Sequence, residues 1–379
     1  MVKQLERSAR RICVADVCEA LEALAPLRRA QKWDNVGLLA GDREAAVRRV
    51  LTCIDLTPAV VDEAVRERVQ LVVAYHPPIF KPLSRLTMPS DDTGALVLRC
   101  IKAGIAIYST HTALDAAEGG TNDRMAQLCG IKQTQPLEYV GNDRAGDCKV
   151  VVFVPEADVD TVAEAMFQAG AGCIGDYEKC SYRLAGTGTF RGTESTKPVI
   201  GEAGRYETVA EIRIESVTPQ AQVPAVIEAI RRAHPYEEPA FDIYPLRPVP
   251  ERGIGRYGDL PQPMTLAALA RKLKNLTEAT CVQMVGETDR RVTRAVICVG
   301  AAGSLPFAIP LGPGDVIITG EIRHHDALAI LRRDCSAIAL GHWASEHPVL
   351  EPFAKALNKR LARLDVLVST ADCEPFAPV

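Results

Sequence analysis

The sequence predicts an α/β protein into which an α+β segment is inserted, and three observations lead to this fold class. Helix-like stretches alternate with strand-like stretches before residue 130, and the alternation returns after residue 253. Residues 71–74 and 105–108 are continuously apolar, as expected of strands covered by helices on both sheet faces. Between the two regions the predicted order is β-α-β-β-α-β, the ferredoxin-like arrangement.

The elements divide the chain into three parts. For residues 1–140 we predict helices and strands alternating at 14–24, 50–54, 58–67, 71–74, 95–103, 105–108 and 122–129. A polar stretch at 141–147 marks a boundary, and for the inserted unit, 147–247, we predict strands at 149–154, 182–191, 207–214 and 240–246 and helices at 158–169 and 223–233. After the linker 247–253, residues 253–379 contain predicted elements at 266–273, 295–299, 316–319, 326–333, 337–340 and 348–364.

The composition agrees with a soluble enzyme that acts on a small polar molecule but does not require one. The 379 residues are 47% hydrophobic and 24% charged, enough for a sizeable core and two or three domains. The formal net charge is −4, and no Lys/Arg cluster alternates with aromatic residues, so nucleic acid is a poor candidate partner. Twelve scattered cysteines without a C-x-x-C pair indicate a reducing cytoplasm. The charged start, residues 1–11, does not resemble a signal peptide, and no apolar run approaches the ~18 residues of a membrane span.

Histidine and carboxylate residues follow three of the predicted strands. His76 comes directly after 71–74, Asp115 comes shortly after 105–108, and His342 with Glu346 follow the apolar run 336–340. A helix that starts at Gly341 would place His342 and Glu346 on one face, where they can hold one ion. Ligands at the carboxyl ends of strands lie in the crevice that open α/β sheets use for binding. We therefore predict a metal site in a discontinuous domain, because neither outer region alone supplies a full ligand set.

Each of these residues also has a structural alternative. His342 and Glu346 could be a helix-start histidine and a solvated acid, and His76 could cap a backbone carbonyl. Asp115 could be the N-cap of a helix. His111 either orients a ligand or is a loop histidine. Glu321 and His325, with His324, follow the strand 316–319 and are candidates for general acid/base catalysis or substrate contact, or else they begin an exposed amphipathic helix.

Three further segments are weaker candidates. The loop 300–304 resembles a strand-to-loop anion cradle, but a tight turn explains it equally well. Trp33-Asp34-Asn35 could line the entrance of the site, where Asp34 could supply a polar contact, or could serve only in packing. His234 in the insert could bind a metal or a regulator, although a structural turn is the better explanation. Tyr75 is a packing or hydrogen-bonding residue rather than a ligand.

Several ordered motifs together resemble one family, the NIF-three-like family, many of whose bacterial members are named GTP cyclohydrolase 1 type 2 homologues. The resemblance covers nearly the whole chain and rests on Trp33-Asp34-Asn35-Val36-Gly37-Leu38, Tyr75-His76-Pro77-Pro78, His111-Thr112-Ala113-Leu114-Asp115, Gly119-Gly120-Thr121-Asn122-Asp123, Thr319-Gly320-Glu321 and Gly341-His342 with Ser345-Glu346. The insert, with Gly175-Asp176-Tyr177 and His234-Pro235-Tyr236-Glu237-Glu238-Pro239, is similar to the middle domain of longer members and to PII/CutA-like trimeric proteins.

The resemblance implies an α/β/α domain that holds two divalent ions per subunit inside a ring-shaped homohexamer. The implied ligands are His76, Asp115, His342, Glu346 and the residue before His76. Many members have His-His where this chain has Tyr75-His76, and a phenol with a pKa of ~10 is a weaker ligand near neutral pH than an imidazole. One or two ions are therefore expected. Imidazole and carboxylate ligands without thiolate suit zinc, iron, manganese, cobalt or nickel.

Hydrolysis is the reaction that such a site favours, because an open coordination position lowers the pKa of water and turns it into a nucleophile. The family name implies opening of the guanine ring of GTP with release of formate. We thus expect a metal-dependent hydrolase that acts on a nucleotide or related heterocycle. The alternatives are a metal-handling or regulatory binding protein and an oligomeric interaction scaffold.

Overall fold

The computed structural model describes residues 11–88, 92–140, 146–246 and 252–377. Residues 1–10, and most of the expected boundary at 141–147 and of the expected linker at 247–253, lie outside these ranges. The chain divides into two compact units: unit 1 comprises Met1–Gly141 and Pro250–Val379, and unit 2 comprises Asn142–Val249. The prediction of a mixed α/β fold is confirmed.

Unit 1 contains two five-stranded sheets. The first has the order β1-β4-β3-β2-β16, in which only β1 is antiparallel to its neighbour. Helices α2 and α12 pack on one face and α3 and α4 on the other, which explains why the central strands are apolar throughout. The bounds are β1 Gly37–Ala40, β2 Arg49–Cys53, β3 Leu71–Ala74, β4 Ala106–Ser109, β16 Asp365–Val368, α2 Val14–Leu24, α3 Pro58–Arg66, α4 Thr93–Lys102 and α12 Leu350–Arg360.

The second sheet of unit 1 has the order β11-β13-β14-β15-β12, with parallel central strands and antiparallel edge strands. Helices α6 and α9 pack on one face, and α10 packs on the other. The bounds are β11 Arg256–Thr265, β12 Gln283–Val285, β13 Arg291–Ala301, β14 Asp315–Glu321, β15 Ser336–Ala339, α6 Thr121–Cys129, α9 Leu266–Thr277 and α10 His324–Arg332. A short pair, β5 (Glu138–Tyr139) and β10 (Gly253–Ile254), joins the two chain segments.

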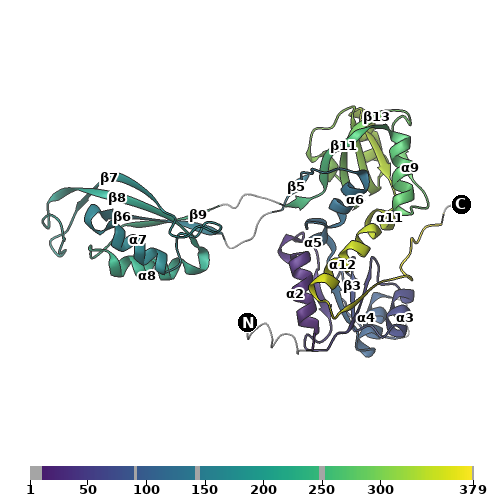
Figure 1. Ribbon diagram of the computed structural model, residues 1–379, viewed down its shortest axis with the longest axis horizontal. Coiled ribbons are helices and arrows are strands. Elements are labelled where there is room, and N and C mark those ends of the chain that lie inside the picture. The colour runs from purple at the N-terminus through teal and green to yellow at the C-terminus, as the bar shows by residue number, and fades with distance from the viewer. Residues whose placement is uncertain (1–10, 89–91, 141–145, 247–251, 378–379) are drawn as a thin grey trace. The chain divides into compact units, whose positions relative to one another are not determined.

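Each of the two sheets of unit 1 packs with elements from both sides of the inserted unit 2. Helix α6, which precedes the insert, packs on the second sheet, whereas α12 and β16 from the C-terminal region complete the first. Figure 1 shows the two sheets at opposite ends of unit 1, with α5 (His111–Asp115), α6, α11 (His342–Glu346) and α12 between them. Residues from both ends of the chain are therefore needed to build the region between the sheets.

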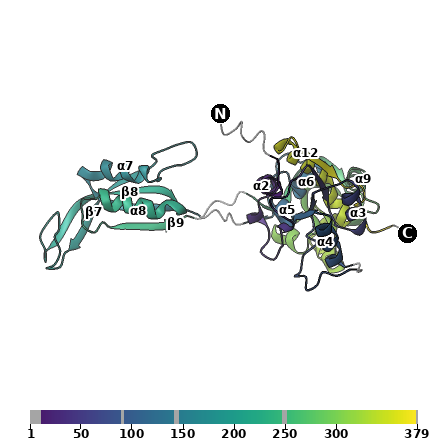
Figure 2. The same cartoon turned by 90° about the horizontal axis from the view of Figure 1, so that it is seen from below.

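Unit 2 is one antiparallel sheet with the order β7-β8-β6-β9. Helices α7 and α8 pack side by side on one face through an apolar core that includes Val152, Met166, Ile214 and Ile230 (Figures 1 and 2). The bounds in chain order are β6 Asp147–Pro155, α7 Val159–Gln168, β7 Tyr182–Arg191, β8 Tyr206–Pro219, α8 Val223–Ala233 and β9 Phe241–Pro245.

Some elements differ from the expectation. The sequence pattern identified none of β1, β11, β12 and β16, and strand β11 is hidden because Pro261 and Pro263 interrupt it and its pairing is irregular between Asp259 and Met264. The helix expected at 348–364 begins at Leu350, after a 3-10 turn, and ends at Arg360. All twelve cysteines are free, and no helix in the described ranges has the length and apolar character to cross a bilayer.

Candidate metal centre

Three side chains from opposite ends of the chain meet between the two sheets of unit 1. Nε2 of His76 lies 3.4 Å from Oε2 of Glu346, and Nε2 of His342 lies 3.3 Å from Oε1 of the same carboxylate. All three ligand atoms lie within 4.8 Å of one another. An imidazole that follows β3 and an imidazole and a carboxylate that follow β15 therefore converge on one point.

Backbone geometry sets the position of each ligand. Beyond the end of β3, the backbone N–H groups of Tyr75 and His76 donate to the carbonyls of Cys53 and Ile54 at 2.8 and 3.0 Å, so His76 is fixed at the sheet edge before Pro77 and Pro78 restrict the turn that follows. Gly341, with φ of +94°, lets the chain turn from β15 into α11. This one-turn helix places His342 and Glu346 on one face, four residues apart.

Both imidazoles are held at their other nitrogen by a carboxylate. Nδ1 of His76 lies 3.0 Å from Oδ1 of Asp55, and Nδ1 of His342 lies 2.9 Å from Oε1 of Glu321. Because a carboxylate accepts, this hydrogen bonding places a proton on each Nδ1 and turns each Nε2 toward Glu346. Metal-binding histidines have this arrangement in most proteins. Glu321, a catalytic candidate from the sequence, thus contacts a ligand residue.

The electrostatics of the centre fit a cation. Glu346 is 3% exposed, and its Oε2 is buried and makes no hydrogen bond of normal geometry within the described residues. Burial alone would raise the pKa of Glu346, but the imidazoles of His342 and His76 lower it. Burial would also lower the pKa of His76, but Asp55 and Glu346 raise it to about 10. Glu346 and, more weakly, Glu321 raise the pKa of His342 to about 9, against burial.

Asp115 lies at the C-terminal end of α5, so the alternative in which it caps the start of a helix is wrong. Its Oδ1 accepts hydrogen bonds from the hydroxyl of Tyr75, at 2.7 Å, and from the hydroxyl of Thr121. Burial raises the pKa of Asp115 in spite of these bonds. Asp115 is not one of the three residues that converge, but it is linked to them through Tyr75, whose ring centroid is 4.9 Å from that of His76.

His111 and Asp34 form a second imidazole–carboxylate pair beside the ligands. Nδ1 of His111 lies 2.8 Å from Oδ1 of Asp34, and the ring centroid of His111 is 5.4 Å from that of His76. Burial would raise the pKa of Asp34, but bonds from His111 and Thr112 lower it. The backbone of His111 has φ of +25°, an uncommon conformation for a residue with a side chain. His111 is therefore oriented, and it is not a loosely held loop histidine.

Aromatic side chains border the centre. Trp33 is 60% exposed and Phe80 49% exposed, and their rings meet edge to face with centroids 5.9 Å apart. Both also contact the ring of His111, at 5.9 and 6.4 Å. Large apolar rings with this exposure form a hydrophobic surface directly next to the ionisable groups.

The remaining candidates from the sequence lie outside the group formed by His76, His342 and Glu346. His325 is exposed on α10, and its ring contact is with His324. The backbone N–H of Gly300 already donates to Ser345 Oγ at 2.8 Å, so the loop 300–304 lacks that donor for an anion. Both nitrogens of His234 bond to the backbone, at 2.8 Å to the carbonyl of Phe153 and 3.1 Å from the N–H of Tyr236, as a structural turn requires.

Asp55 was missed by the sequence reasoning, although a signal existed. It directly follows the strand predicted at 50–54, which is adjacent to and parallel with β3, so its carboxylate had to reach the same sheet edge as His76. Thr121 lies in the motif Gly119–Asp123, but its bond to Asp115 could not be read from spacing.

The sequence and the fold both have known relatives. Residues 12–375 match the family described as Duf34/NIF3 (NGG1p interacting factor 3). A Mycobacterium tuberculosis protein called GTP cyclohydrolase 1 type 2 homolog is 38% identical over 368 residues, 96% of this chain and 96% of that protein. A Bacillus subtilis protein of the same name is 33% identical over 364 residues, 95% of this chain and 97% of that protein. A Bacillus cereus structure described as related to NIF3 has a TM-score of 0.75 and 31% identity, and the match covers 98% of this chain and 100% of that one.

Proposed function

The chain belongs to the Duf34/NIF3 family, and from this premise we propose that unit 1 is a divalent-metal-dependent hydrolase of a nucleotide or related heterocycle. The observation that carries the proposal is the convergence of two Nε2 atoms and one buried carboxylate, with both Nδ1 atoms anchored by carboxylates. The shared name of the curated relatives, GTP cyclohydrolase 1 type 2 homolog, agrees with a nucleotide substrate.

His76, His342 and Glu346 would hold the ion. This donor set suits zinc, iron, manganese, cobalt or nickel. A bound divalent ion acts as a Lewis acid and lowers the pKa of a water molecule. The hydroxyl of Tyr75 donates a hydrogen bond to Asp115, and burial raises the pKa of Tyr75 well above its ordinary value, so this phenol is not a ligand near neutral pH. We therefore propose one tightly held ion per chain.

His111 is the proposed general acid/base. Asp34 holds its Nδ1, which leaves Nε2 to accept or deliver a proton at the substrate, as a carboxylate-oriented imidazole does in other hydrolases. His325 is the catalytic candidate that the sequence suggested. Within the described residues, its side chain contacts the ring of His324 and makes no hydrogen bond or ion pair. Glu321 acts as a positioning residue, because it contacts His342 through Nδ1.

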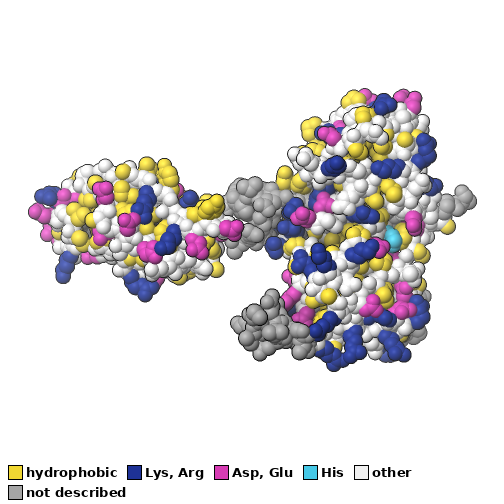
Figure 3. Space-filling model, in the orientation of Figure 1, with side chains coloured by type: hydrophobic (Ala, Val, Ile, Leu, Met, Phe, Trp, Pro, Cys, Tyr) yellow, Lys and Arg dark blue, Asp and Glu magenta, His cyan; other side chains and the backbone are white. Residues whose placement is uncertain are grey.

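Trp33 and Phe80 support a substrate with a flat ring. Aromatic side chains bind planar heterocycles by offset stacking or edge-to-face contact, and these two rings border His111. On the face of unit 1 in Figure 3, Lys/Arg and Asp/Glu side chains are interspersed. Together with the net charge of −4, this surface favours a small molecule over a nucleic acid strand.

We also propose that residues 147–247 are an inserted ferredoxin-like domain of the PII/CutA type, carried by a metal-binding domain made of residues 1–140 and 253–379. The β-α-β-β-α-β order and the sheet order β7-β8-β6-β9 support the ferredoxin-like assignment. A homohexameric assembly is proposed from the family resemblance, and a cytoplasmic location from the scattered cysteines without a C-x-x-C pair.

The test is a metal analysis joined to an activity panel. Protein loaded with zinc, manganese or iron is assayed against nucleotides, free heterocycles and phosphoesters. We expect hydrolysis of a heterocycle-containing compound, loss of both metal and activity in His342→Ala, and loss of activity with retained metal in His111→Ala. Metal uptake without turnover of any compound would instead favour the metal-handling or scaffold alternatives.

A further inference from the structure

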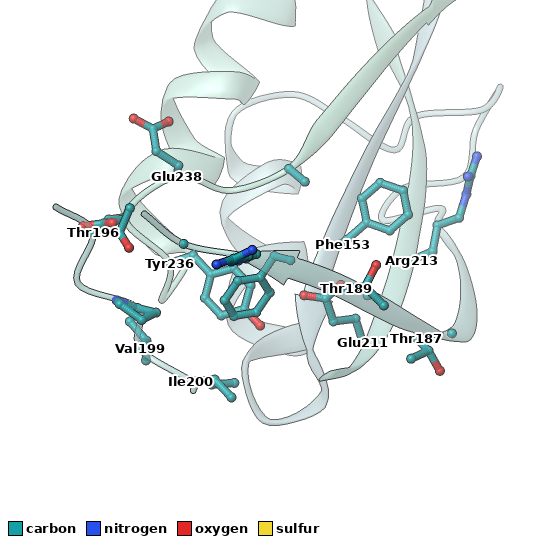
Figure 4. A pocket seen from close by; sticks show the side chains of 18 of the residues that line it. Phe153, Thr187, Thr189, Thr196, Val199, Ile200, Glu211, Arg213, Tyr236 and Glu238 are labelled. Atoms are coloured by element: carbon teal, nitrogen blue, oxygen red, sulfur yellow. The ribbon is translucent and has the colours of Figure 1, made fainter. Parts of the chain in front are cut away.

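Carboxylates inside the fold differ in what their hydrogen bonds connect. In unit 2, Glu211 interacts with the hydroxyl of Tyr236 where both line a cavity of about 570 Å³, so these two polar groups are matched within that unit (Figure 4). In unit 1, the carboxylate of Asp372 connects two separate segments, and each segment lies next to proposed metal ligands. Asp372 is not one of the three residues that converge, but it lies where it can set their geometry.

Asp372 lies in the segment that follows β16, and hydrogen bonds hold this segment in place. Asp372 is 5% exposed. Its N–H donates to the hydroxyl of Ser369 at 3.1 Å, and the N–H of Ser369 donates to the carbonyl of Thr52 in β2 at 2.8 Å. The segment is thus bonded to the first sheet of unit 1 just before Asp372, and burial leaves the carboxylate little freedom of position.

The carboxylate holds the backbone next to His76. Oδ2 of Asp372 accepts the N–H of Ile54 at 2.5 Å, and Oδ1 lies 3.5 Å from the backbone nitrogen of Asp55. The carbonyl of Ile54 accepts the N–H of His76 at 3.0 Å, and Oδ1 of Asp55 lies 3.0 Å from Nδ1 of the His76 ring. The main chain and the ring of His76 are therefore both tied to the residues that Asp372 holds.

The same carboxylate reaches the helix that carries His342. Oδ1 accepts the indole N–H of Trp343 at 3.1 Å, and Trp343 directly follows His342 in α11. The indole is also stacked on the ring of His347, with centroids 4.1 Å apart. A Cβ added at Gly341 would lie 3.1 Å from Oε2 of Glu374. The C-terminal segment therefore lies against α11 both at the turn before the helix and at Trp343.

Helix α11 needs such external contacts to keep its place. It is five residues long, and no side chain among the described residues caps its start. A helix of a single turn has little stability of its own. Hydrogen bonds accepted by a carboxylate are stronger than neutral ones. Metal ligands must be held within about 0.5 Å of the productive geometry, and the groups behind them supply that precision. Asp372 does this for both sheets, because Ile54 follows β2 and Trp343 follows β15.

We propose that Asp372 is a positioning residue of the metal centre. Its carboxylate bridges the backbone next to His76 and the indole next to His342, and so fixes the separation of the two imidazoles, whose ring centroids are 5.3 Å apart. This role rests on the proposed function, because it concerns the same centre. It adds the C-terminal segment to the parts of the chain that shape the centre.

Cobalt(II) is the probe that tests this role on the full chain, because its visible absorption reports coordination geometry and its titration gives the affinity. Asp372→Ala removes the shared acceptor and leaves the N–H groups of Ile54 and Trp343 unpaired. We expect an altered cobalt spectrum and an affinity that is lower by about ten- to a hundredfold, the loss typical of residues that hold metal ligands. A merely structural role would lower stability without changing the spectrum of bound cobalt.

Two further variants make the test specific. Trp343→Phe keeps an aromatic ring and removes the indole donor, so it should alter the spectrum in the same direction but less. Asp315→Ala is the matched control. Asp315 is also 5% exposed and accepts hydrogen bonds from Arg294 at 2.6 Å and from the N–H of Gly312 at 2.7 Å. It begins β14, whereas Glu321 ends this strand at the metal centre. We expect Asp315→Ala to lower the melting temperature and to leave the cobalt spectrum and affinity unchanged.

The outcomes separate this role from the metal centre itself. A natural chain that takes up no cobalt would overturn both. If the natural chain binds cobalt, an unchanged spectrum and affinity in Asp372→Ala would overturn the positioning role alone. Where Asp372→Ala does not fold, Trp343→Phe decides by the same criterion. An equal effect in Asp315→Ala would also overturn the role, because lost stability would then explain the result.

Discussion

The hydroxyl of Tyr75, the residue directly before the proposed ligand His76, donates a 2.7 Å hydrogen bond to Oδ1 of Asp115. The phenol is buried, and burial raises its pKa well above the ordinary value, so it remains protonated. A side chain at this position that keeps its proton supports Asp115 through a hydrogen bond and contributes no ligand atom. The Tyr75–Asp115 bond therefore bears directly on how many ions the centre holds.

Tyr75→His is predicted to raise the metal content from one ion per chain to two. An imidazole at this position supplies a neutral nitrogen next to Asp115, whereas Tyr75→Phe removes the hydroxyl and adds no ligand, so it should still bind one ion. Metal content after dialysis, measured by mass spectrometry, distinguishes the variants. Two ions in the natural chain, or one in Tyr75→His, would show that Tyr75 does not limit the site.

Gly300→Ala is predicted to weaken metal binding by at least a hundredfold. The new Cβ would lie 2.2 Å from Oε1 of Glu346 and 3.2 Å from Nε2 of His342, so the carboxylate must leave its position. Gly303→Ala is the matched control, because Gly303 also has a positive φ, +54° against +64°, but has no atom within 4 Å of the added Cβ. Equal metal affinity in the two variants would contradict the clash.

Metal affinity is predicted to rise with pH up to about pH 10, the higher of the two pKa values of His76 and His342. With pKa values of about 10 and 9, His76 and His342 are both protonated at neutral pH, and an ion must displace these protons. Binding at pH 7 should therefore release about two protons. Calorimetry in buffers with different ionisation enthalpies measures the number. Binding that releases no proton would mean that the ion does not contact these imidazoles.

Glu63→Gln is predicted to destabilise unit 1 at pH 7 by about 1–3 kcal/mol, as expected when a buried, multiply bonded carboxylate is lost. Glu63 is 4% exposed and accepts bonds from Thr370, at 3.0 Å from N and 2.6 Å from Oγ1, from the hydroxyl of Ser369 and, at 3.3 Å, from the N–H of Ala371. Denaturant unfolding at neutral pH gives the free energy, with the exposed Glu19→Gln as control.

The same carboxylate makes stability depend on pH. Burial would raise the pKa of Glu63, but its bonds to Ser369, Thr370 and Ala371 hold it below 4.5 in the folded state. The stabilisation is then fully present above pH 4.5 and is lost as the pH falls through the folded-state pKa. Glu63→Gln should show a weaker loss of stability over this acidic range than the natural chain. Parallel acid profiles would contradict the role of Glu63.

The convergence of His76, His342 and Glu346 could be predicted because each follows an apolar strand-like run. Parallel strands place their carboxyl ends at one edge, and helical spacing places His342 and Glu346 together, so local pattern alone brings these side chains to the right surfaces. The pairing of strands could not be predicted in the same way. An apolar run shows that a strand is buried but does not identify the strand with which it pairs. The division of unit 1 into two sheets was therefore not predicted.

Other parts of the site depend on contacts that spacing does not encode. The sequence could not decide whether His111 is a loop histidine or a residue that orients a ligand. In the structure, Asp34, which is 77 residues away in sequence, lies beside its Nδ1. His325 was chosen because it follows β14, but the start of α10 leaves it exposed. Strand β11 was missed because its two prolines are typical of a loop, although β13 pairs with it on both sides of the irregularity.

The most direct measurement is the metal affinity of His342→Ala compared with the natural chain, with His324→Ala as a control on the exposed start of α10. His342 is one of three proposed ligands from opposite ends of the chain, so its loss should weaken zinc or manganese binding by at least a hundredfold while His324→Ala binds as the natural chain does. Unchanged metal binding in His342→Ala, with the fold intact by circular dichroism, would contradict a metal centre formed by His76, His342 and Glu346.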